Sequence, residues 1–387
     1  MRILHTADWH LGRIFNGFSL LEDQAILVEQ IAEMVEEEKP DLFVLAGDVF
    51  DRANPRREAV ELFDQFLERI YRNTRCALAV IAGNHDAPER IGFGGALHDP
   101  RRVLIRGGLG RSAGPLLLED NQGTVAVSAL PYAGVFAARD HFGEPGITNP
   151  DQVLAAQIAE ARSLLPEDAR QIVVSHTFVA GGAGSESERS LESAGGIEQV
   201  SPERYAGASY VAMGHLHRPQ QITLQSGTLR YSGSIMPFGF DEIETEKSVT
   251  LLELEWWGVE TLRTLPLSPP RPLRVLRGSF DELLSGGSEA EPEAFVKLEL
   301  TDRLPVPDAM TRLRQSYPNA VQLDWINREI LPSGERVGAS REGLGDPEGV
   351  IRSFLVDVGV EEFSPEQEAI LQTAVAEARK EDQEDPS

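Results

Sequence analysis

The sequence predicts an α/β protein organised around a mainly parallel sheet, and its first hundred residues carry this prediction. Short apolar runs at residues 2–7, 42–46 and 79–82 are rich enough in β-branched and aromatic side chains to be strands buried on both faces. Apolar residues recur at helical spacing between them, over 21–35 and 60–70. This order predicts a β-α-β-α-β unit whose right-handed crossovers place the strands side by side in one sheet.

Length and composition indicate a globular protein of two or three domains. The chain has 387 residues, of which 41% are hydrophobic and 25% are charged, as in proteins with a large buried core. Its apolar runs fall short of the roughly 18–20 residues that a membrane-spanning helix requires, and it opens on a strand rather than on a signal segment. Cys76 is the only cysteine, which excludes an intrachain disulfide. We therefore expect no membrane association and a cytoplasmic location.

The charge balance limits how the chain can bind nucleic acid. Thirty-six basic and 62 acidic residues give a net charge of −26, which argues against indiscriminate binding to polyanions. A nucleic-acid substrate stays possible, because two bound divalent ions would add about four positive charges where phosphate sits. Arginines also cluster after the second strand, at Arg52, Arg56 and Arg57. For these, solvated surface charge and phosphate contact are equally good interpretations.

The chain up to residue 268 continues with elements that would complete this domain. Residues 103–131 predict shorter strands, and a helix over 151–164 leads to a strand that ends at His176. A Gly- and Ser-rich stretch at 181–188 predicts a loop next to the strand ends, which either gates the substrate or has no function. Residues 222–265 read as antiparallel strands with glycine turns.

A cluster of prolines at 269–272 marks a domain boundary. Beyond it, alternating strands and one helix over 306–317 predict a small α+β module over 269–332, without a metal-type cluster of its own. A Gly-rich linker over 333–346 follows, and then a tail of two amphipathic helices over 347–387. Such a helix pair either packs back on its parent domain or docks on another protein.

Five predicted strands end in side chains that are common metal ligands, at the edge where α/β sheets place their ligands. A single Asp-x-His is weak evidence for a metal site, because a buried histidine that pairs with a carboxylate is commoner than one that binds a metal. Five of the eight histidines sit in these elements, however, so a purely structural explanation for all of them is poor. Oxygen and imidazole donors without thiolates suit Mn²⁺, Fe²⁺ or Zn²⁺ better than Ca²⁺ or a structural zinc.

The motifs at these strand ends resemble the calcineurin-like metallophosphoesterase superfamily over about residues 1–240. Residues 5–12, 214–218, 233–237 and 240–242 further resemble the SbcD family, the nuclease subunits of bacterial SbcCD complexes. The resemblance implies a four-layer sandwich of α/β class, a small α+β capping domain and a helical tail that binds a partner. The motifs that carry it are Asp8-x-His10, Gly47-Asp48-x-x-Asp51, Gly83-Asn84-His85-Asp86, His176 and Gly214-His215-x-His217.

For the site, the resemblance implies two divalent ions, of which Mn²⁺ is the first choice. The ligands of one ion would be Asp8, His10, Asp48 and His217, and those of the other Asp48, Asn84, His176 and His215. His85 would serve as general acid or transition-state donor, oriented by Asp86. Asp51 would not bind an ion itself, but its carboxylate would hold a ligand side chain in place. Arg218 joins Arg52, Arg56 and Arg57 as a candidate DNA contact.

The resemblance implies a Mn²⁺-dependent DNA nuclease with single-strand endonuclease and double-strand 3′–5′ exonuclease activity on hairpins and blocked ends. It would act in DNA repair and recombination with an SbcC-type ATPase bound to the tail. A homodimer would form through helices near 57–71 and 89–98. Two alternatives stay open. A phosphomonoesterase or nucleotide phosphodiesterase of the same fold would have little use for the module and the tail. A non-catalytic DNA-end-binding scaffold would not be expected to keep every ligand.

Overall fold

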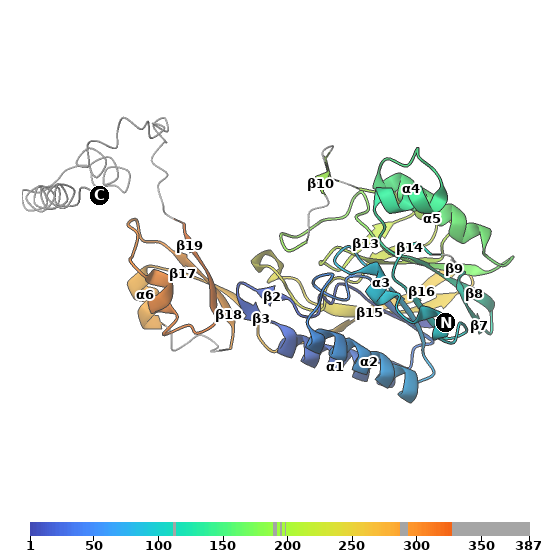
Figure 1. The fold of residues 1–387 in the computed structure, drawn as a ribbon. Coiled ribbons are helices and arrows are strands. Elements are labelled where there is room, and N and C mark those ends of the chain that lie inside the picture. Colours follow the sequence, from blue (N-terminus) through green and yellow to red (C-terminus); the bar gives the residue numbers. More distant parts are fainter. Residues whose placement is uncertain (111–113, 189–191, 194–195, 198, 287–292, 327–387) are drawn as a thin grey trace, which may run out of the picture. The chain divides into compact units, whose positions relative to one another are not determined.

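The chain divides into two units, one of Met1–Arg274 with Glu293–Phe295 and the other of Val275–Pro292 with Val296–Ser387. The computed structural model describes residues 1–110, 114–188, 192–193, 196–197, 199–286 and 293–326 (Figure 1). The expected linker over 333–346 and the helical tail over 347–387 lie outside the described residues, as does the end of the expected capping module at 327–332.

The first sheet of unit 1 carries the strands that the N-terminal residues predict. Its six strands are β16 (Gly258–Pro266), β15 (Ser248–Glu255), β1 (Arg2–Thr6), β4 (Leu42–Ala46), β5 (Ala77–Ile81) and β6 (Val103–Arg106), in that order. Strands β1, β4, β5 and β6 run parallel, whereas β15 pairs antiparallel with both β1 and β16. Helices α1 (Leu21–Glu38) and α2 (Arg57–Asn73) make the crossovers. The β-α-β-α-β prediction is confirmed.

The second sheet also has six strands and a parallel centre. Its order is β13 (Gln220–Thr223), β14 (Thr228–Tyr231), β12 (Tyr210–Gly214), β9 (Arg170–His176), β8 (Gly123–Leu130) and β7 (Leu116–Asp120). Strands β8, β9, β12 and β14 are parallel, and β7 and β13 close the two edges antiparallel. The antiparallel prediction over 222–265 is confirmed for the pairs β13–β14 and β15–β16. Strands β13 and β14 form a hairpin, but its returning strand lies parallel to β12.

The two sheets pack face to face, and helices cover their outer faces, so unit 1 has four layers (Figure 1). Helices α1 and α2 lie on one side, and α4 (Val135–Phe142) and α5 (Pro150–Ser163) on the other. Because both faces of the central strands are covered, all five residues of β4 are buried. The expected four-layer α/β sandwich is confirmed. The buried cluster between the sheets includes Val44, Ala79, Val127, Ile172 and Ala212.

Aromatic packing fixes the loop that follows β1. Trp9 is fully buried, and its ring centroid lies 5.0 Å from that of Phe66 on α2 and 6.4 Å from that of Phe43 on β4, both edge to face. Its indole N–H donates to the Thr6 hydroxyl at 3.0 Å. Such a large anchor holds the polar residues on either side of it against the end of the sheet.

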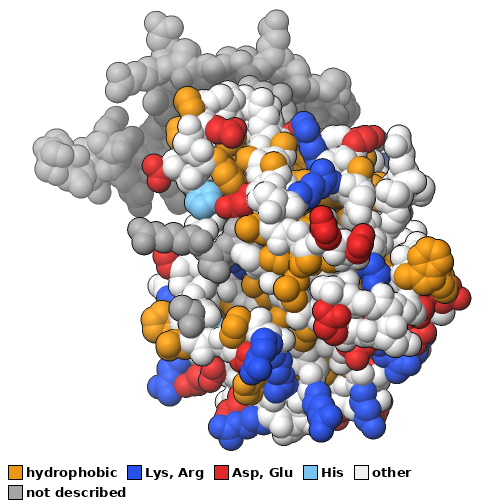
Figure 2. Space-filling model, turned by 90° about the vertical axis from the view of Figure 1, so that its right-hand side faces the viewer, with side chains coloured by type: hydrophobic (Ala, Val, Ile, Leu, Met, Phe, Trp, Pro, Cys, Tyr) orange, Lys and Arg blue, Asp and Glu red, His pale blue; other side chains and the backbone are white. Residues whose placement is uncertain are grey.

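The other elements of unit 1 are short. They are β2 (Ile14–Phe15), β3 (Phe18–Ser19), α3 (Pro88–Ile91), β10 (Glu192–Ser193), β11 (Gly196–Ile197) and 3₁₀ turns at Gly95–Leu97, Pro202–Tyr205 and Phe240–Glu242. No helix of the described ranges has both the length and the apolar content to span a bilayer. Figure 2 shows that acidic and basic side chains are mixed on the face it presents.

Unit 2 is built on the small sheet of β17 (Leu273–Gly278), β18 (Phe295–Leu300) and β19 (Ala320–Trp325), in that order. Strands β18 and β19 are parallel. Helix α7 (Ala309–Leu313) lies within the predicted helical stretch, and α6 (Phe280–Gly286) is a helix that the sequence pattern did not indicate. Phe280 and Leu283 of α6 and Leu313 of α7 are buried, so both helices contribute to the core of this unit.

Candidate metal centre

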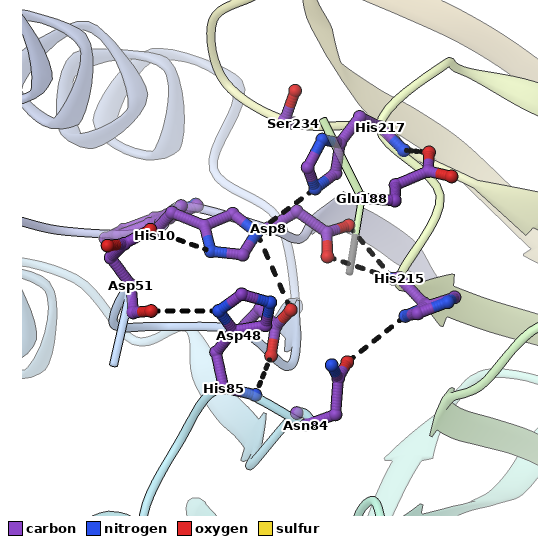
Figure 3. Close-up of polar contacts among 12 residues, drawn as sticks. Asp8, His10, Asp48, Asp51, Asn84, His85, Glu188, His215, His217 and Ser234 are labelled. Atoms are coloured by element: carbon purple, nitrogen blue, oxygen red, sulfur yellow. Dashed lines mark hydrogen bonds and ion pairs between the residues drawn. The ribbon is translucent and has the colours of Figure 1, made fainter. Parts of the chain in front are cut away.

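The ends of five parallel strands bring seven of the predicted ligands together. Asp8 and His10 follow β1, Asp48 follows β4, and Asn84 follows β5 in the first sheet. His176 ends β9, and His215 and His217 follow β12 in the second. Figure 3 shows side chains of both sheets pointing into one space between the strand ends. The carboxyl edges of the two sheets thus form one site from residues more than two hundred positions apart.

One group of donors consists of Asp8, His10 and His217. One potential ligand atom from each lies within 4.8 Å of the other two, and all three residues are buried. The Nε2 atoms of His10 and His217 are only 3.1 Å apart. Two imidazole nitrogens that face each other beside a carboxylate form a set of borderline donors suited to a transition-metal ion.

A second group surrounds Asn84. Its side-chain oxygen lies 3.0 Å from Nε2 of His176 and 3.1 Å from Nδ1 of His215. Asp48 contributes a carboxylate oxygen 3.4 Å from Nε2 of His176. The Asn84 amide nitrogen is buried, and no protein acceptor among the described residues satisfies it. This orphaned donor indicates a polar neighbour, such as a water or a substrate oxygen, next to the ligands.

Asp48 joins the two groups. The same oxygen, Oδ2, lies 3.6 Å from Nε2 of His10 and 3.4 Å from Nε2 of His176. The other oxygen, Oδ1, accepts the backbone N–H of His85 at 2.9 Å, which fixes the orientation of the carboxylate. A carboxylate held in this way has the geometry of a ligand shared by two ions.

Hydrogen bonds from behind set the tautomers of two histidines. Nδ1 of His176 lies 2.8 Å from the carbonyl of Ala46, which only accepts, so Nδ1 carries a proton and Nε2 is the nitrogen that faces the site. Nδ1 of His217 lies 2.6 Å from the Ser187 hydroxyl, which in turn donates to Glu242. Both rings are therefore oriented as ligands before any ion binds.

The electrostatics of the site favour cations. Burial raises the pKa of Asp8 well above its usual range, and the neighbouring carboxylate of Asp48 raises it further. Although burial alone would raise the pKa of Asp48 as well, His176 holds it well below its usual range. Two carboxylates enclosed this closely are stable together only beside positive charge, which divalent ions would supply. The donor set and the burial thus fit a pair of metal ions.

Backbone strain marks the same residues. The φ angles of Asp8, His10, Asp48 and His215 are 55°, 46°, 48° and 103°. Positive φ is uncommon for residues with a Cβ, although Asp and His tolerate it better than most, and it costs about 1–3 kcal/mol per residue. Strain at four adjoining positions indicates a functional site rather than ordinary core packing.

Three glycines leave the space that the site needs. A Cβ on Gly47 would lie 2.3 Å from Nδ1 of His176, and one on Gly83 would lie 2.1 Å from Oδ1 of Asp48. A Cβ on Gly214 would lie 1.9 Å from the carbonyl of Ala46. Each motif therefore needs its glycine, because the strand ends approach one another through that position.

His85 and Asp51 lie beside the ligand cluster. Nδ1 of His85 donates to the carbonyl of Asp51 over 2.8 Å, and its ring meets the edge of His10 at 4.6 Å between centroids. The Asp51 carboxylate is 3.9 Å from Nδ1 of His10, so it stands behind that ring. Atoms of His10, Asp51 and His85 also lie close enough together to form a third potential metal group.

The expectation that Asp86 orients His85 is wrong in this structure. The Asp86 carboxylate accepts backbone N–H groups of Val49, Phe50 and Gly83 at 2.9–3.1 Å. The carbonyl of Asp51 orients the His85 ring instead. Asp86 is buried, so these three donors satisfy a carboxylate that would otherwise be costly. It clamps the turn after β4 onto the turn after β5, and it positions ligands through the backbone.

The four arginines singled out from the sequence have different surroundings. Arg52 is 62% exposed and lies 3.5 Å from the carboxylate of Asp51. Arg57 pairs with Glu61 one turn along α2, and Arg56, just before α2, is exposed. Arg218 instead donates to the carbonyl and carboxylate of Asp241 at 2.8 and 2.9 Å. Of the four, Arg52 is therefore the arginine placed beside the ligand cluster.

Four residues that sequence reasoning did not assign complete the site: Ser187, Glu188, Glu242 and Lys247. Glu188 accepts the backbone N–H of His217 at 2.7 Å. Lys247 is buried, pairs with Glu242 and donates to the carbonyl of His217 at 2.7 Å. Their isolated positions give no periodic signal. Asp241 and Glu242, in the stretch 240–242 that resembles the SbcD family, were the one available hint.

Comparisons with known proteins identify relatives of this chain. The family model described as calcineurin-like phosphoesterase matches residues 1–219, and the model described as type 5 capsule protein repressor C-terminal domain matches 269–358. A Staphylococcus saprophyticus protein, named as the D subunit of the nuclease SbcCD, is 33% identical over 324 residues, 84% of this chain and 84% of that protein. Its namesake in Staphylococcus epidermidis is 32% identical over 327 residues, 84% of this chain and 86% of that protein. The solved structure of TT1561 from Thermus thermophilus covers 69% of this chain and 99% of its own, at 17% identity and a TM-score of 0.42.

Proposed function

The chain belongs to the calcineurin-like phosphoesterases and, within them, to the SbcD family of SbcCD nuclease subunits, and from this premise we propose that it cleaves DNA phosphodiester bonds with two divalent ions. The observation that carries the proposal is the position of Asp48. One of its oxygens lies between a histidine of one donor group and a histidine of the other. A shared carboxylate between two half-sites suits in-line cleavage of a phosphodiester.

We assign Asp8, His10, Asp48 and His217 to one ion and Asp48, Asn84, His176 and His215 to the other. When bound, two such ions neutralise phosphate charge and make water acidic enough to serve as the nucleophile at neutral pH. Mn²⁺ is the proposed metal, since mixed carboxylate, amide and imidazole donors suit it and thiolates are absent from both sets. The buried hydrogen bonds from Ala46 and Ser187 support this assignment, because they turn histidine lone pairs toward the ions.

His85 is the proposed proton donor. Its Nδ1–H is engaged by the Asp51 carbonyl, so Nε2 is the nitrogen left to exchange a proton with the substrate. In the protonated ring, Nε2 can donate to the leaving oxygen or to a charged oxygen of the phosphate in the transition state. The pocket beside the cluster includes His85, which supports this position for a reacting group.

We further propose that residues 1–268 form the nuclease domain, 269–332 a capping domain for DNA, 333–346 a linker and 347–387 a docking tail for an SbcC-type ATPase. The names of the two staphylococcal relatives, as D subunits of SbcCD, support such a partner. We also propose a homodimer. Phe93 and Leu97 support it, because their side chains are 85% and 89% exposed near α3, and apolar residues this exposed commonly mark an interface.

The proposed activities are single-strand endonuclease and double-strand 3′–5′ exonuclease on hairpins and blocked ends. The test is an assay of the full chain with Mn²⁺, Mg²⁺ or Zn²⁺ on hairpin, single-stranded and blunt DNA, with and without the ATPase. Manganese-dependent cleavage that Asp48→Asn abolishes is the expected result. Hydrolysis of nitrophenyl phosphates without cleavage of DNA would favour a phosphomonoesterase, and DNA binding without turnover would favour a scaffold.

A further inference from the structure

An open pocket of about 470 Å³ adjoins the metal centre on the side of His85. Its volume is within the range of pockets that bind small molecules. Two of its wall residues are cationic, although the chain as a whole is strongly acidic. The residues that line it are Arg13, Ile14, Asp51, Arg52, His85, Ser187 and Glu188.

Arg13 is held rigidly in this wall. Its guanidinium lies 4.6 Å from the centroid of the Phe238 ring, and its side chain is 16% exposed. One terminal nitrogen donates to the Ser187 carbonyl at 3.1 Å. The stacked, anchored side chain has already lost most of its rotational freedom, so it would bind an anion with little further entropic cost.

Arg13 nevertheless has donors to spare. A guanidinium carries five N–H groups, and the acceptors it has among the described residues are the Ser187 carbonyl and Oδ1 of Asp51, the latter at a long 3.5 Å. Oδ2 of the same carboxylate lies 3.5 Å from a terminal nitrogen of Arg52. One carboxylate thus faces two guanidiniums at a distance and saturates the donors of neither.

The remaining acid in the wall is already engaged. The oxygens of Glu188 accept the backbone N–H groups of His217 and Ser185 at 2.7 and 2.9 Å. Glu188 therefore does not compete strongly for Arg13. A phosphate oxygen can approach Arg13 from the pocket, and Arg is well suited to hold phosphate through two parallel hydrogen bonds.

We propose that Arg13, with Arg52 at the rim, binds the DNA phosphate next to the scissile one, so that the nucleotide beside the cut occupies this pocket. The inference rests on the proposed function and names a substrate contact for the same site. It makes Arg13 a substrate-binding residue, three positions after His10 in sequence and outside both sets of proposed ligands.

The test compares full-length R13A and R13K with the wild type, and R101A serves as a matched control. Arg101 is 88% exposed and pairs with Asp99 away from the pocket. Binding of a fluorescein-labelled oligothymidylate is measured by anisotropy without divalent ions, over a series of KCl concentrations. We expect R13A to weaken binding about tenfold and to reduce the slope of log K against log [salt] by about 0.7, the value for one phosphate contact on a single strand. R13K keeps the charge, so it should keep the slope, and R101A should match the wild type.

Manganese titration of the same variants separates substrate binding from support of the fold. We expect R13A to bind manganese within twofold of the wild type. Wild-type affinity and slope for R13A would overturn the inference, as would lost manganese affinity in both R13A and R13K. If the wild type cleaves DNA while R13A binds it normally, the role of Arg13 alone fails. If the wild type neither binds nor cleaves DNA, the proposed function fails with it.

Discussion

His85 is oriented by a backbone carbonyl rather than by a carboxylate, and this decides what its replacement should do. The Asp51 carbonyl and the edge of the His10 ring fix the imidazole, while both proposed ion sites keep their full donor sets without it. We expect His85→Ala to retain both metal ions and to lose about 10²–10⁴-fold in nuclease turnover, the usual contribution of a positioned proton donor. Parallel manganese titration and cleavage kinetics measure the two effects.

His141→Ala is the matched control for this substitution. His141 lies on α4, where its Nε2 is 3.5 Å from Glu160, and it has no contact with the ligand cluster among the interactions of the described residues. Its replacement should leave turnover unchanged. Cleavage by His85→Ala at the wild-type rate would remove His85 from the mechanism.

Cys76 gives a residue-scale test of the core. Its side chain is buried, and burial raises the pKa of the thiol to about 12. Because the thiolate is the reactive form, only about one thiol in ten thousand would be reactive at pH 8 in the folded protein. Labelling by iodoacetamide at pH 8 should therefore be slow, should rise with pH toward 12, and should become rapid in denaturant. Rapid labelling of the folded protein at pH 8 would show that the start of β5 is open to solvent.

At the scale of elements, the turns that follow the strands position the proposed ligands. Gly83 follows β5, its N–H donates to the Asp86 carboxylate at 2.9 Å, and a Cβ there would meet Asp48. We expect Gly83→Ala to destabilise the protein by about 1–3 kcal/mol through overpacking and to weaken manganese binding, because Asp48 must move. Chemical denaturation and metal titration measure the two changes.

Gly134→Ala is the control, since a Cβ on Gly134 meets no atom within 4 Å and Gly134 has an ordinary negative φ as the N-cap of α4. Gly134→Ala should leave both the free energy of unfolding and the manganese affinity close to the wild-type values. Unaltered manganese affinity in Gly83→Ala would mean that the approach of the β5 turn to Asp48 is not needed for the site.

How much the sequence predicts depends on whether a feature is local. The strands that deliver Asp8, Asp48 and His176 were predictable, since each is a short apolar run that ends in a polar motif. The parallel pairing of β14 with β12 was not, because hairpin and crossover connections can share one alternating pattern. Helix α6 was missed because its seven residues are too few for a periodic signal.

The hydrogen bonds that hold the ligands in place could not be predicted from the sequence. Glu242 reaches His217 through Ser187, and Asp86 reaches the turn after β4 through backbone N–H groups. Both depend on distances between segments far apart in sequence. Asp86 follows His85 directly in sequence, and this adjacency suggested that its carboxylate orients the imidazole. In the structure, the carboxylate instead holds the turn after β4 against the turn after β5.

At the scale of the whole molecule, a strongly acidic chain forms a candidate cation site by burying two carboxylates at the strand ends. Asp8 and Asp48 are buried at the centre, and the arginines Arg13 and Arg52 stand at the pocket beside it. With two divalent ions bound, about four positive charges would be added at this point. The net charge of −26 is therefore compatible with a DNA substrate, and binding should weaken as salt rises.

The tail assignment is also tested on the whole molecule. Deleting residues 346–387 should leave manganese-dependent nicking by the isolated chain intact, because the seven proposed ligands lie between Asp8 and His217. The same deletion should abolish binding to the SbcC-type ATPase. Co-purification of the two proteins measures the second effect, and retained binding would refute the docking role of the tail.

The central claim is that seven side chains from the ends of five strands hold two ions around one shared carboxylate. Its most direct test is calorimetric titration of the metal-free full-length protein with Mn²⁺, for the wild type, Asp48→Ala and the exposed-surface control Asp140→Ala. We predict two ions per chain in the wild type and the control, and weakened binding of both ions in Asp48→Ala. A single ion in the wild type, or two ions bound with wild-type affinity in Asp48→Ala, would contradict the account.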